Sequence, residues 1–275
     1  MSVDLEKQAV NRAVWSAGKW DRVADYVAEV GPGLLDAVGI EEGMRVLDIG
    51  TGSGGSVAIP AAKRGAEVTG SDISSVHFDA ARERATSAGV EVDWVEADGL
   101  DLPFDDGSFD RVLSTFGHMF APDHQQAASE MVRVTKPGGV IGFCCWTPDG
   151  STGRMFRITG SHMPPPPEGF QPPPLWGSED HVRSLMEPLG VELSFERKLN
   201  DFREENLELY KETFQTNFGP MVKAREVLGD GWLALKADLD AFFEEENEAE
   251  DGTVLIRGEY LQTIAKRAVD RSAAT

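Results

Sequence analysis

Arg45-Val-Leu-Asp-Ile-Gly-Thr-Gly-Ser-Gly-Gly55 is a short apolar run that contains one acid and ends in a glycine-rich turn. Its apolar residues predict a strand buried on both faces, as in a parallel sheet. The glycines let the chain turn sharply and bring backbone close to a ligand, because they carry no Cβ. Residues 57–64 predict a helix despite Pro60 near its start. Strand, turn and helix together predict a cofactor crevice at the carboxyl end of a sheet.

The glycine spacing also fits the dinucleotide fingerprint G-x-G-x-x-G, so a nicotinamide or flavin enzyme is an alternative. Asp48 argues against it, because an acid two residues before the first glycine is poorly placed for a docking pyrophosphate. The first basic residues after the turn, Lys63 and Arg64, stand at the far end of the predicted helix. The sequence therefore favours a cofactor without phosphate.

Acids also follow the next two predicted strands. Asp72 comes after residues 66–71, and Asp98 comes after residues 92–97. Acids at successive strand ends suit a ligand that has ribose hydroxyls, an adenine amino group and a cationic centre. S-adenosylmethionine has all three.

Four motifs now stand in order along the chain: residues 46–54, 70–74, 97–110 and 133–139. In these motifs the chain resembles the class I S-adenosylmethionine-dependent methyltransferases, and more narrowly the branch related to ubiquinone and menaquinone biosynthesis methyltransferases. The resemblance covers roughly residues 40–148 and weakens in the last hundred residues. It implies an α/β, Rossmann-like, doubly wound and mostly parallel seven-stranded sheet whose last strand is antiparallel, beside the sixth.

Three parts are expected along the chain: an N-terminal helical cap at 1–38, a cofactor-binding core at 39–148 and a substrate-side half at 149–275. Residues 31–33 (Gly-Pro-Gly) are expected to interrupt the cap's helices. Asp123 is expected to cap a core helix. The core strands are predicted near 44–49, 66–71, 91–97, 109–115 and 139–147, and its helices near 55–64, 75–88 and 123–134.

The substrate-side half begins with two proline runs, at 164–167 and 172–174. They favour extended geometry and predict either a linker or adaptor-binding tract, or an ordered segment on the carboxyl edge of the sheet. The aromatic residues around them favour the ordered segment. A sixth strand is predicted at 191–198 and a last one at 253–265, with a bulge at Gly258. The helical insertion between them, residues 206–245, is expected to cover the pocket or to form a homodimer interface.

Position and resemblance assign roles in cofactor binding. Asp72 is expected to accept the ribose hydroxyls, with Ile73 beside the adenine, and Asp98 to accept the adenine amino group. Either acid has the simpler alternative of an Asx turn or a helix cap. Asp48 is expected to reach the methionine ammonium directly or through water. The remaining expected contacts are Trp20, as part of a lid, and Gly50, Thr51, Gly52, Ala97, Gly99 and Ser114.

Methyl transfer is an in-line displacement that needs alignment and exclusion of water more than acid–base groups. His118, in the loop after the fourth strand, is the candidate base because an imidazole can accept a proton near neutral pH. Its alternative is a loop histidine that only caps or packs. The substrate pocket is expected to be lined by Phe116, Met119, Trp146, Phe170 and Trp176.

Composition limits the partners. The net charge of −21 argues against nucleic acid and anionic membrane surfaces. No run approaches 18 apolar residues, so membrane insertion is not expected. The adjacent cysteines Cys144 and Cys145 point to opposite faces of a strand and predict a reduced, cytoplasmic protein. The histidine spacing predicts no metal site.

These observations predict a methyltransferase that acts on a small, apolar or aromatic metabolite at oxygen, nitrogen or carbon, with S-adenosyl-L-methionine as cofactor. One alternative is an NAD(P)-dependent oxidoreductase. The other is a catalytically silent protein that binds the cofactor and acts through partners.

Overall fold

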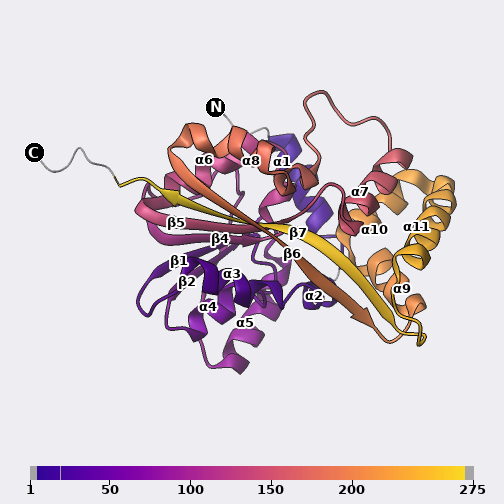
Figure 1. The fold of residues 1–275 in the computed structure, drawn as a ribbon, viewed down its shortest axis with the longest axis horizontal. Coiled ribbons are helices and arrows are strands. Elements are labelled where there is room, and N and C mark those ends of the chain that lie inside the picture. The colour runs from indigo at the N-terminus through magenta and orange to yellow at the C-terminus, as the bar shows by residue number, and fades with distance from the viewer. Residues whose placement is uncertain (1–4, 19, 270–275) are drawn as a thin grey trace, which may run out of the picture.

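The computed structural model describes residues 5–18 and 20–269, which form one seven-stranded sheet in the order β3-β2-β1-β4-β5-β7-β6 (Figure 1). The first five strands of that order are parallel, and β7 runs antiparallel to both β5 and β6. This confirms the predicted fold class. The strand bounds are β1 Arg45–Ile49, β2 Glu67–Asp72, β3 Asp93–Glu96, β4 Phe109–Thr115, β5 Thr135–Trp146, β6 Val191–Glu204 and β7 Val254–Arg267.

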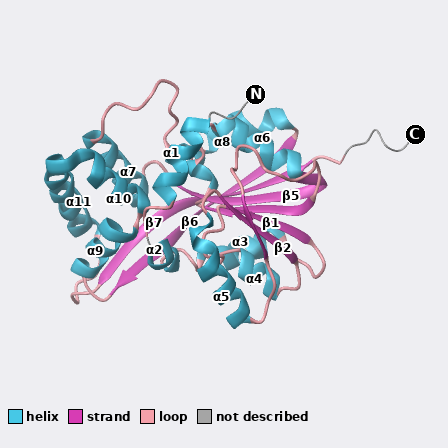
Figure 2. Ribbon diagram, turned by 180° about the vertical axis from the view of Figure 1, so that it is seen from behind, coloured by secondary structure: helices cyan, strands magenta, loops and turns pink. Residues whose placement is uncertain are grey.

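Helices cover both faces of the sheet (Figures 1 and 2). In Figure 1, α3, α4 and α5 lie below the strands and α6 and α8 lie above them, while α7 and α9–α11 gather at one end. The helix bounds are α1 Leu5–Trp15, α2 Trp20–Asp25, α3 Val30–Val38, α4 Ala58–Lys63, α5 Phe78–Ala88, α6 His124–Val134, α7 Ser151–His162, α8 Glu179–Met186, α9 Leu207–Asn217, α10 Gly219–Leu228 and α11 Trp232–Glu246.

The core lies between the sheet and these helices. Leu34 of α3 and Ile141 of β5 have no exposed surface, and burying such a side chain stabilises the fold by roughly 1.5–3 kcal/mol. At Gly142, an added Cβ would stand 2.5 Å from Cγ1 of Val38, so a side chain there would push α3 off the sheet. The apolar runs of the sequence thus become the central strands.

The cap differs from its prediction at residues 31–33. This Gly-Pro-Gly run was expected to interrupt the helices, but it lies in the first turn of α3. Proline is tolerated there because the first backbone N–H groups of a helix have no intrahelical acceptor.

The last two strands are longer than predicted. Both have 14 residues and pair without interruption from Val191↔Arg267 to Glu204↔Val254. Their far ends continue past the sheet as a two-stranded arm that reaches the helical insertion (Figure 1). The bulge expected at Gly258 is absent from this pairing. Gly258 is required instead by packing, since a Cβ there would lie 2.7 Å from the Phe202 ring and 2.8 Å from the Trp146 ring.

The segment before the prolines is helical. Residues 151–162 form α7, a helix that the glycine and β-branched residues of this segment concealed in the sequence. The second proline run leads into a 3-10 helix at Pro173–Gly177 that packs on β5 and α8. Only this second part of the segment packs against the sheet as expected, whereas residues 164–170 are exposed on a loop that projects from the body (Figure 1).

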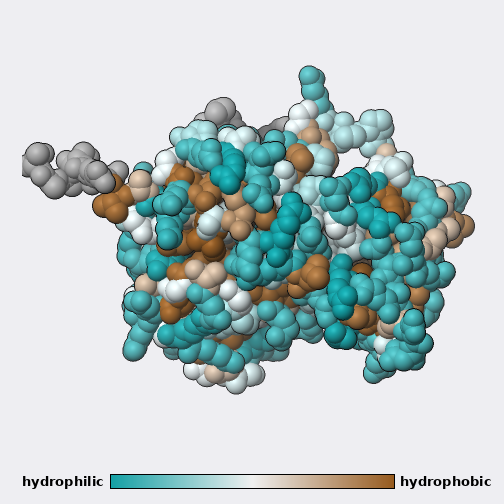
Figure 3. Space-filling model, in the orientation of Figure 1, coloured by the Kyte–Doolittle hydropathy of each residue, from teal (hydrophilic) through white to brown (hydrophobic). Residues whose placement is uncertain are grey.

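Hydrophilic residues cover most of the face in Figure 3, with separate apolar patches between them. Within the described part of the chain, no helix is long and apolar enough to cross a membrane.

Candidate functional site

A pocket opens at the carboxyl ends of β1, β2 and β4 and beside the loop after β3, and it is closed from above by α1 and α2. The structure brings eleven of the predicted site residues together around it. They are Trp20, Gly50, Thr51, Gly52, Asp72, Ile73, Ala97, Asp98, Gly99, Phe116 and His118. The carboxyl ends of parallel strands meet at one edge, which explains why residues far apart in sequence converge here.

The glycine turn after β1 depends on positive φ angles at Gly50 (70°) and Gly52 (52°). The turn also packs tightly: a Cβ on Gly50 would lie 2.7 Å from the Cα of Gly117, and one on Gly52 would lie 3.1 Å from Cδ1 of Trp20. A side chain at either position would therefore close the pocket or displace its walls.

Asp48 is buried beneath this turn. Its Oδ2 accepts hydrogen bonds from the Thr51 hydroxyl (2.7 Å) and the Ala58 backbone N–H (3.2 Å). Burial raises the pKa of Asp48 to about 7. The carboxyl group does not line the pocket, so it shapes the turn and the start of α4 from behind. The Asp48 carboxylate also occupies the Ala58 N–H at the start of α4, a donor that a dinucleotide's pyrophosphate would need free.

Asp72, at the end of β2, faces the pocket. Its Oδ2 accepts the Gly52 N–H at 2.9 Å and its Oδ1 accepts the Ser74 N–H at 3.0 Å. Burial raises the pKa of this carboxyl group above its usual range. Two carboxylate oxygens offer about four acceptor positions, so lone pairs remain for ligand hydroxyls.

Asp98 forms the Asx turn that was its simpler alternative, and it also lies at the pocket. Its Oδ1 accepts the Leu100 N–H at 3.0 Å, which makes an Asx turn, and the residue also lines the pocket with Ala97 and Gly99. Among the described residues, no hydrogen bond involves its Oδ2.

Ser114 lies behind the pocket wall. Its hydroxyl donates to the Ile49 carbonyl (2.6 Å) and accepts the His118 N–H (3.0 Å), and the residue has no exposed surface. It fastens the loop after β4 to the end of β1. In that loop Phe116 has φ 62°, the one positive value of a non-glycine residue in the described chain. Such backbone strain in a bulky residue marks a position that the surrounding fold holds in place.

The His118 ring is enclosed. It packs against Phe143 and Trp176 at centroid distances of 4.7 and 4.8 Å, and neither ring nitrogen has a hydrogen-bond partner among the residues that the structure describes. Burial lowers the pKa of His118 to about 3. A base must contact the proton that it removes. Of the two expected roles, this geometry favours packing.

Four predicted substrate-pocket residues lie away from this cavity. Met119, Trp146 and Trp176 are buried in the core, and Phe170 is 48% exposed on the proline-rich loop. Trp146 stacks on Phe116, with ring centroids 3.9 Å apart, and so supports the pocket wall from behind.

Further lining residues come from the lid, formed by α1 and α2, and from the loop after β4. Asn11 and Trp15 line the pocket from α1, and Phe120 lines it from that loop. Trp15 and Phe120 are aromatic residues that the sequence offered as lid and pocket lining, whereas Asn11 was not predicted. Trp15 contacts Phe120 at 4.5 Å and Trp20 at 5.5 Å between ring centroids. The i,i+4 spacing of Asn11 and Trp15 on one helix face was the available signal.

Polar contacts fasten the lid to the core. The hydroxyl groups of Ser16 and Ser74 are 2.8 Å apart, and His77 Nε2 lies 3.2 Å from the Trp15 carbonyl oxygen. His77 itself lines the pocket. The lid therefore meets the core beside Asp72.

The chemistry of the pocket suits S-adenosylmethionine. Acids stand at the ends expected for ribose and adenine, and Ser53 Oγ is buried at the pocket without a partner. No lysine or arginine is among the described residues that line it. Among the described residues, no group of three His, Cys, Asp or Glu side chains is arranged to hold a metal ion.

Comparisons with known proteins agree with this geometry. The family model described as "Methyltransferase domain" matches residues 46–139. The Mycobacterium tuberculosis protein named Uncharacterized protein Rv1405c is 38% identical over 239 residues, which cover 86% of each chain. Demethylmenaquinone methyltransferase of Thermus thermophilus is 38% identical over 127 residues, or 46% of this chain and 50% of that enzyme.

Among solved structures, the YcgJ protein from a Bacillus species has a TM-score of 0.60 with 16% sequence identity. The match covers 87% of this chain and 99% of that one. At this identity the likeness shows a shared fold.

Proposed function

Since the chain belongs to the class I S-adenosylmethionine-dependent methyltransferases, we propose that it methylates a small, apolar or aromatic metabolite at oxygen, nitrogen or carbon. The observation that carries this proposal is the composition of the pocket beside the strand ends. The part lined by Trp15, Trp20 and Phe120, called the outer pocket below, adjoins the glycine turn where Trp20 faces Gly52. Flat apolar surfaces there suit a flat apolar acceptor.

The inner part of the pocket would hold the cofactor. Asp72 would accept the ribose hydroxyls, and Asp98 would accept the adenine amino group between Ala97 and Gly99. The turn at residues 50–52 would lie along the methionine portion. When bound, S-adenosylmethionine supplies an electrophilic methyl group on a positively charged sulfur.

The chain's own residues would align the acceptor and exclude water. The indole rings of Trp15 and Trp20 close the pocket from the lid, and their faces favour a neighbouring positive charge. Alignment and desolvation suffice for an acceptor that is already nucleophilic. A side-chain base is not needed in this scheme, which agrees with the enclosed ring of His118.

The oxidoreductase alternative is disfavoured by Asp48, whose carboxyl group bonds to the first N–H of α4 at 3.2 Å. Isothermal titration separates the two functions. We expect binding of S-adenosylhomocysteine and none of NADH, and the reverse would overturn the proposal.

Turnover separates an enzyme from a silent cofactor-binding protein. The decisive experiment incubates the protein with S-adenosylmethionine and a panel of phenols, quinols, amines and thiols, and measures S-adenosylhomocysteine release. Release that depends on both acceptor and protein supports the proposal. Binding of the cofactor without release for any acceptor favours the silent protein.

We further propose a cytoplasmic enzyme without nucleic-acid partners. Cys144 and Cys145 are buried free thiols, and the net charge is −21. A homodimer through the helical insertion stays a prediction, supported by the exposed Val227 and Leu233 on α10 and α11. The narrower menaquinone-related branch is supported by a relative that matches less than half of the chain.

A further inference from the structure

The loop between β3 and β4 carries one wall of the pocket. Ala97, Asp98 and Gly99 lie at its start and line the cavity, whereas residues 100–106 run along α6. Apart from a single bridge between Asp98 and Asp101, this stretch takes no part in the sheet. Backbone hydrogen bonds tie its two ends, from the Ala97 N–H to the Asp72 carbonyl (2.8 Å) and from the Gly107 N–H to the Arg133 carbonyl (2.9 Å). Side chains of α6 hold the stretch between these ends.

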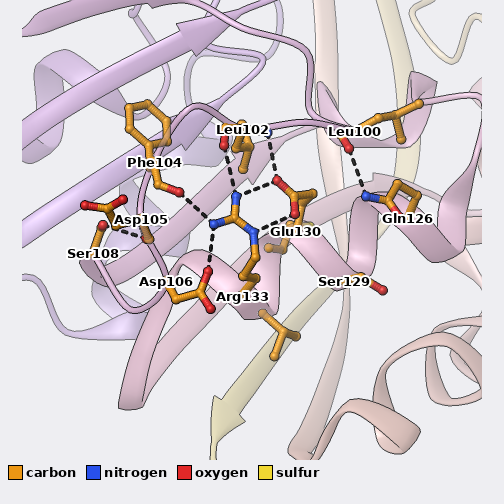
Figure 4. Close-up of polar contacts among 12 residues, drawn as sticks. Leu100, Leu102, Phe104, Asp105, Asp106, Ser108, Gln126, Ser129, Glu130 and Arg133 are labelled. Carbon is orange, nitrogen blue, oxygen red and sulfur yellow. Dashed lines mark hydrogen bonds and ion pairs between the residues drawn. The ribbon is translucent and has the colours of Figure 1, made fainter. Parts of the chain in front are cut away.

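Arg133, in the last turn of α6, supplies most of that fixation (Figure 4). A guanidinium has five N–H donors in a rigid plane, and here each has an acceptor. Nε and one Nη2 hydrogen go to the two oxygens of Glu130, both at 2.7 Å. The others go to the Leu102 carbonyl (2.9 Å), the Phe104 carbonyl (2.6 Å) and Asp106 Oδ1 (3.0 Å).

Glu130 completes the attachment. Its side chain is only 9% exposed, and its Oε2 also accepts the Leu102 backbone N–H at 2.8 Å. Arg133 and Glu130 thus hold Leu102 from both sides: Arg133 donates to its carbonyl, and Glu130 accepts from its N–H. One turn earlier, Gln126 donates to the Leu100 carbonyl at 3.0 Å.

These contacts end beside the pocket. The Leu100 carbonyl is held by α6 through Gln126, while the Leu100 N–H donates to Asp98 Oδ1. We infer that Arg133, acting with Glu130 and Gln126, is a positioning residue that sets Asp98 and its neighbours against the adenine end of the cofactor. This inference rests on the proposed function, because it concerns the same pocket.

The chain offers a matched control in Arg267. Its Nη1 donates to the Val132, Arg133 and Thr135 carbonyls and so ties the carboxyl end of the same helix. Within the described chain, its side chain makes no hydrogen bond or ion pair with residues 97–106. Replacing Arg267 by Gln should lower stability without releasing the loop.

The test compares the wild type with Arg133→Gln, Arg133→Lys and Arg267→Gln by isothermal titration with S-adenosylhomocysteine. Each variant is measured below its own unfolding temperature. We expect Kd to rise at least tenfold for Arg133→Gln, less for Arg133→Lys, and under threefold for Arg267→Gln. Hydrogen exchange of residues 97–106 should accelerate in Arg133→Gln and not in Arg267→Gln.

A role in stability alone would lower the melting temperature of both glutamine variants and leave both Kd values alike, which would overturn the inference. If Arg133→Gln does not fold, Gln126→Ala decides, since it removes only the bond to the Leu100 carbonyl. It should raise Kd about threefold, and an unchanged Kd would count against the inference. A wild type that does not bind S-adenosylhomocysteine would instead refute the proposed function itself.

Discussion

The carboxylate of Asp72 accepts the backbone N–H of Gly52 at 2.9 Å, which joins the end of β2 to the glycine turn after β1. One side chain thus shapes the turn and faces the ligand space. The carboxylate also presents free lone pairs to the pocket. Its loss should therefore weaken both the glycine turn and the binding of ligand hydroxyls.

Replacing Asp72 by Ala is expected to raise the Kd for S-adenosylhomocysteine at least about tenfold, because each charge-assisted hydrogen bond contributes about 1.5–3 kcal/mol. Asp72→Asn keeps an acceptor for the Gly52 N–H, so its Kd should lie between those of the wild type and Asp72→Ala. Isothermal titration measures both. Asp79→Ala is the control, since that carboxylate is exposed at the surface and pairs with Arg82. Unchanged affinity in a folded Asp72→Ala protein would remove Asp72 from the site.

Gly52→Val should abolish cofactor binding in a protein that still folds. The new side chain meets the Trp20 ring and fills the turn that faces the pocket. Positive φ adds strain of roughly 1–3 kcal/mol. Gly89→Val is the matched control, because Gly89 has φ 71° but a Cβ added there would meet nothing within 4 Å. Equal loss of binding in both variants would assign the effect to backbone strain.

Much of the inner pocket could be predicted from sequence because its signals are local. Asp72 and Asp98 follow strands directly, and the glycine turn lies within one strand–helix unit. Parallel topology then brings these segments to one edge.

The residues of the outer pocket could not be predicted from local sequence patterns. Phe170 and Trp176 were expected there because aromatic residues crowd that segment, yet one is exposed and the other is core. Aromatic composition indicates that side chains are buried, but it does not indicate which part of the protein they pack against. The lid contact of Trp15 with Phe218 joins positions about two hundred residues apart, and no local pattern encodes it.

Asp48 should make stability depend on pH. Its folded pKa of about 7 lies above the unfolded value near 4, so the folded state binds the proton more tightly between these values. The contribution of Asp48 to the free energy of unfolding is therefore fully present below pH 4 and is lost as the pH rises through 7. Between pH 5.5 and 8 the loss is about 2 kcal/mol, at 1.36 kcal/mol per unit.

Urea unfolding of the wild type and Asp48→Asn at both pH values isolates this contribution. The asparagine variant is expected to lose less stability over the interval, and Asp72 remains in both proteins. The same pH dependence in both would show that Asp48 is already ionised at pH 5.5.

His118→Phe is expected to keep the fold and at least one third of the turnover rate. Phenylalanine fills a similar volume between Phe143 and Trp176 and removes two buried nitrogens that have no partner. Each unsatisfied group costs roughly 1–3 kcal/mol, so the melting temperature should stay level or rise. His118→Ala would instead leave a cavity and lower it. A hundredfold loss of kcat with unchanged cofactor affinity would restore His118 as the base.

Phe120 is expected to contribute to binding of the methyl acceptor and so to determine which acceptor the enzyme uses. Its ring contacts Trp15 of the lid and Phe156 of α7, with centroid distances of 4.5 and 5.9 Å, and it lines the pocket. Phe120→Ala is expected to raise the acceptor KM about tenfold or more, because it removes roughly 1.5–3 kcal/mol of buried apolar contact. The Kd for S-adenosylhomocysteine should change less than threefold, a difference below about 0.7 kcal/mol. Phe170→Ala is the control of like chemistry: that ring is 48% exposed outside the pocket, so neither constant should change twofold. If Phe170→Ala raised KM and Phe120→Ala did not, the acceptor would bind along the proline-rich loop instead.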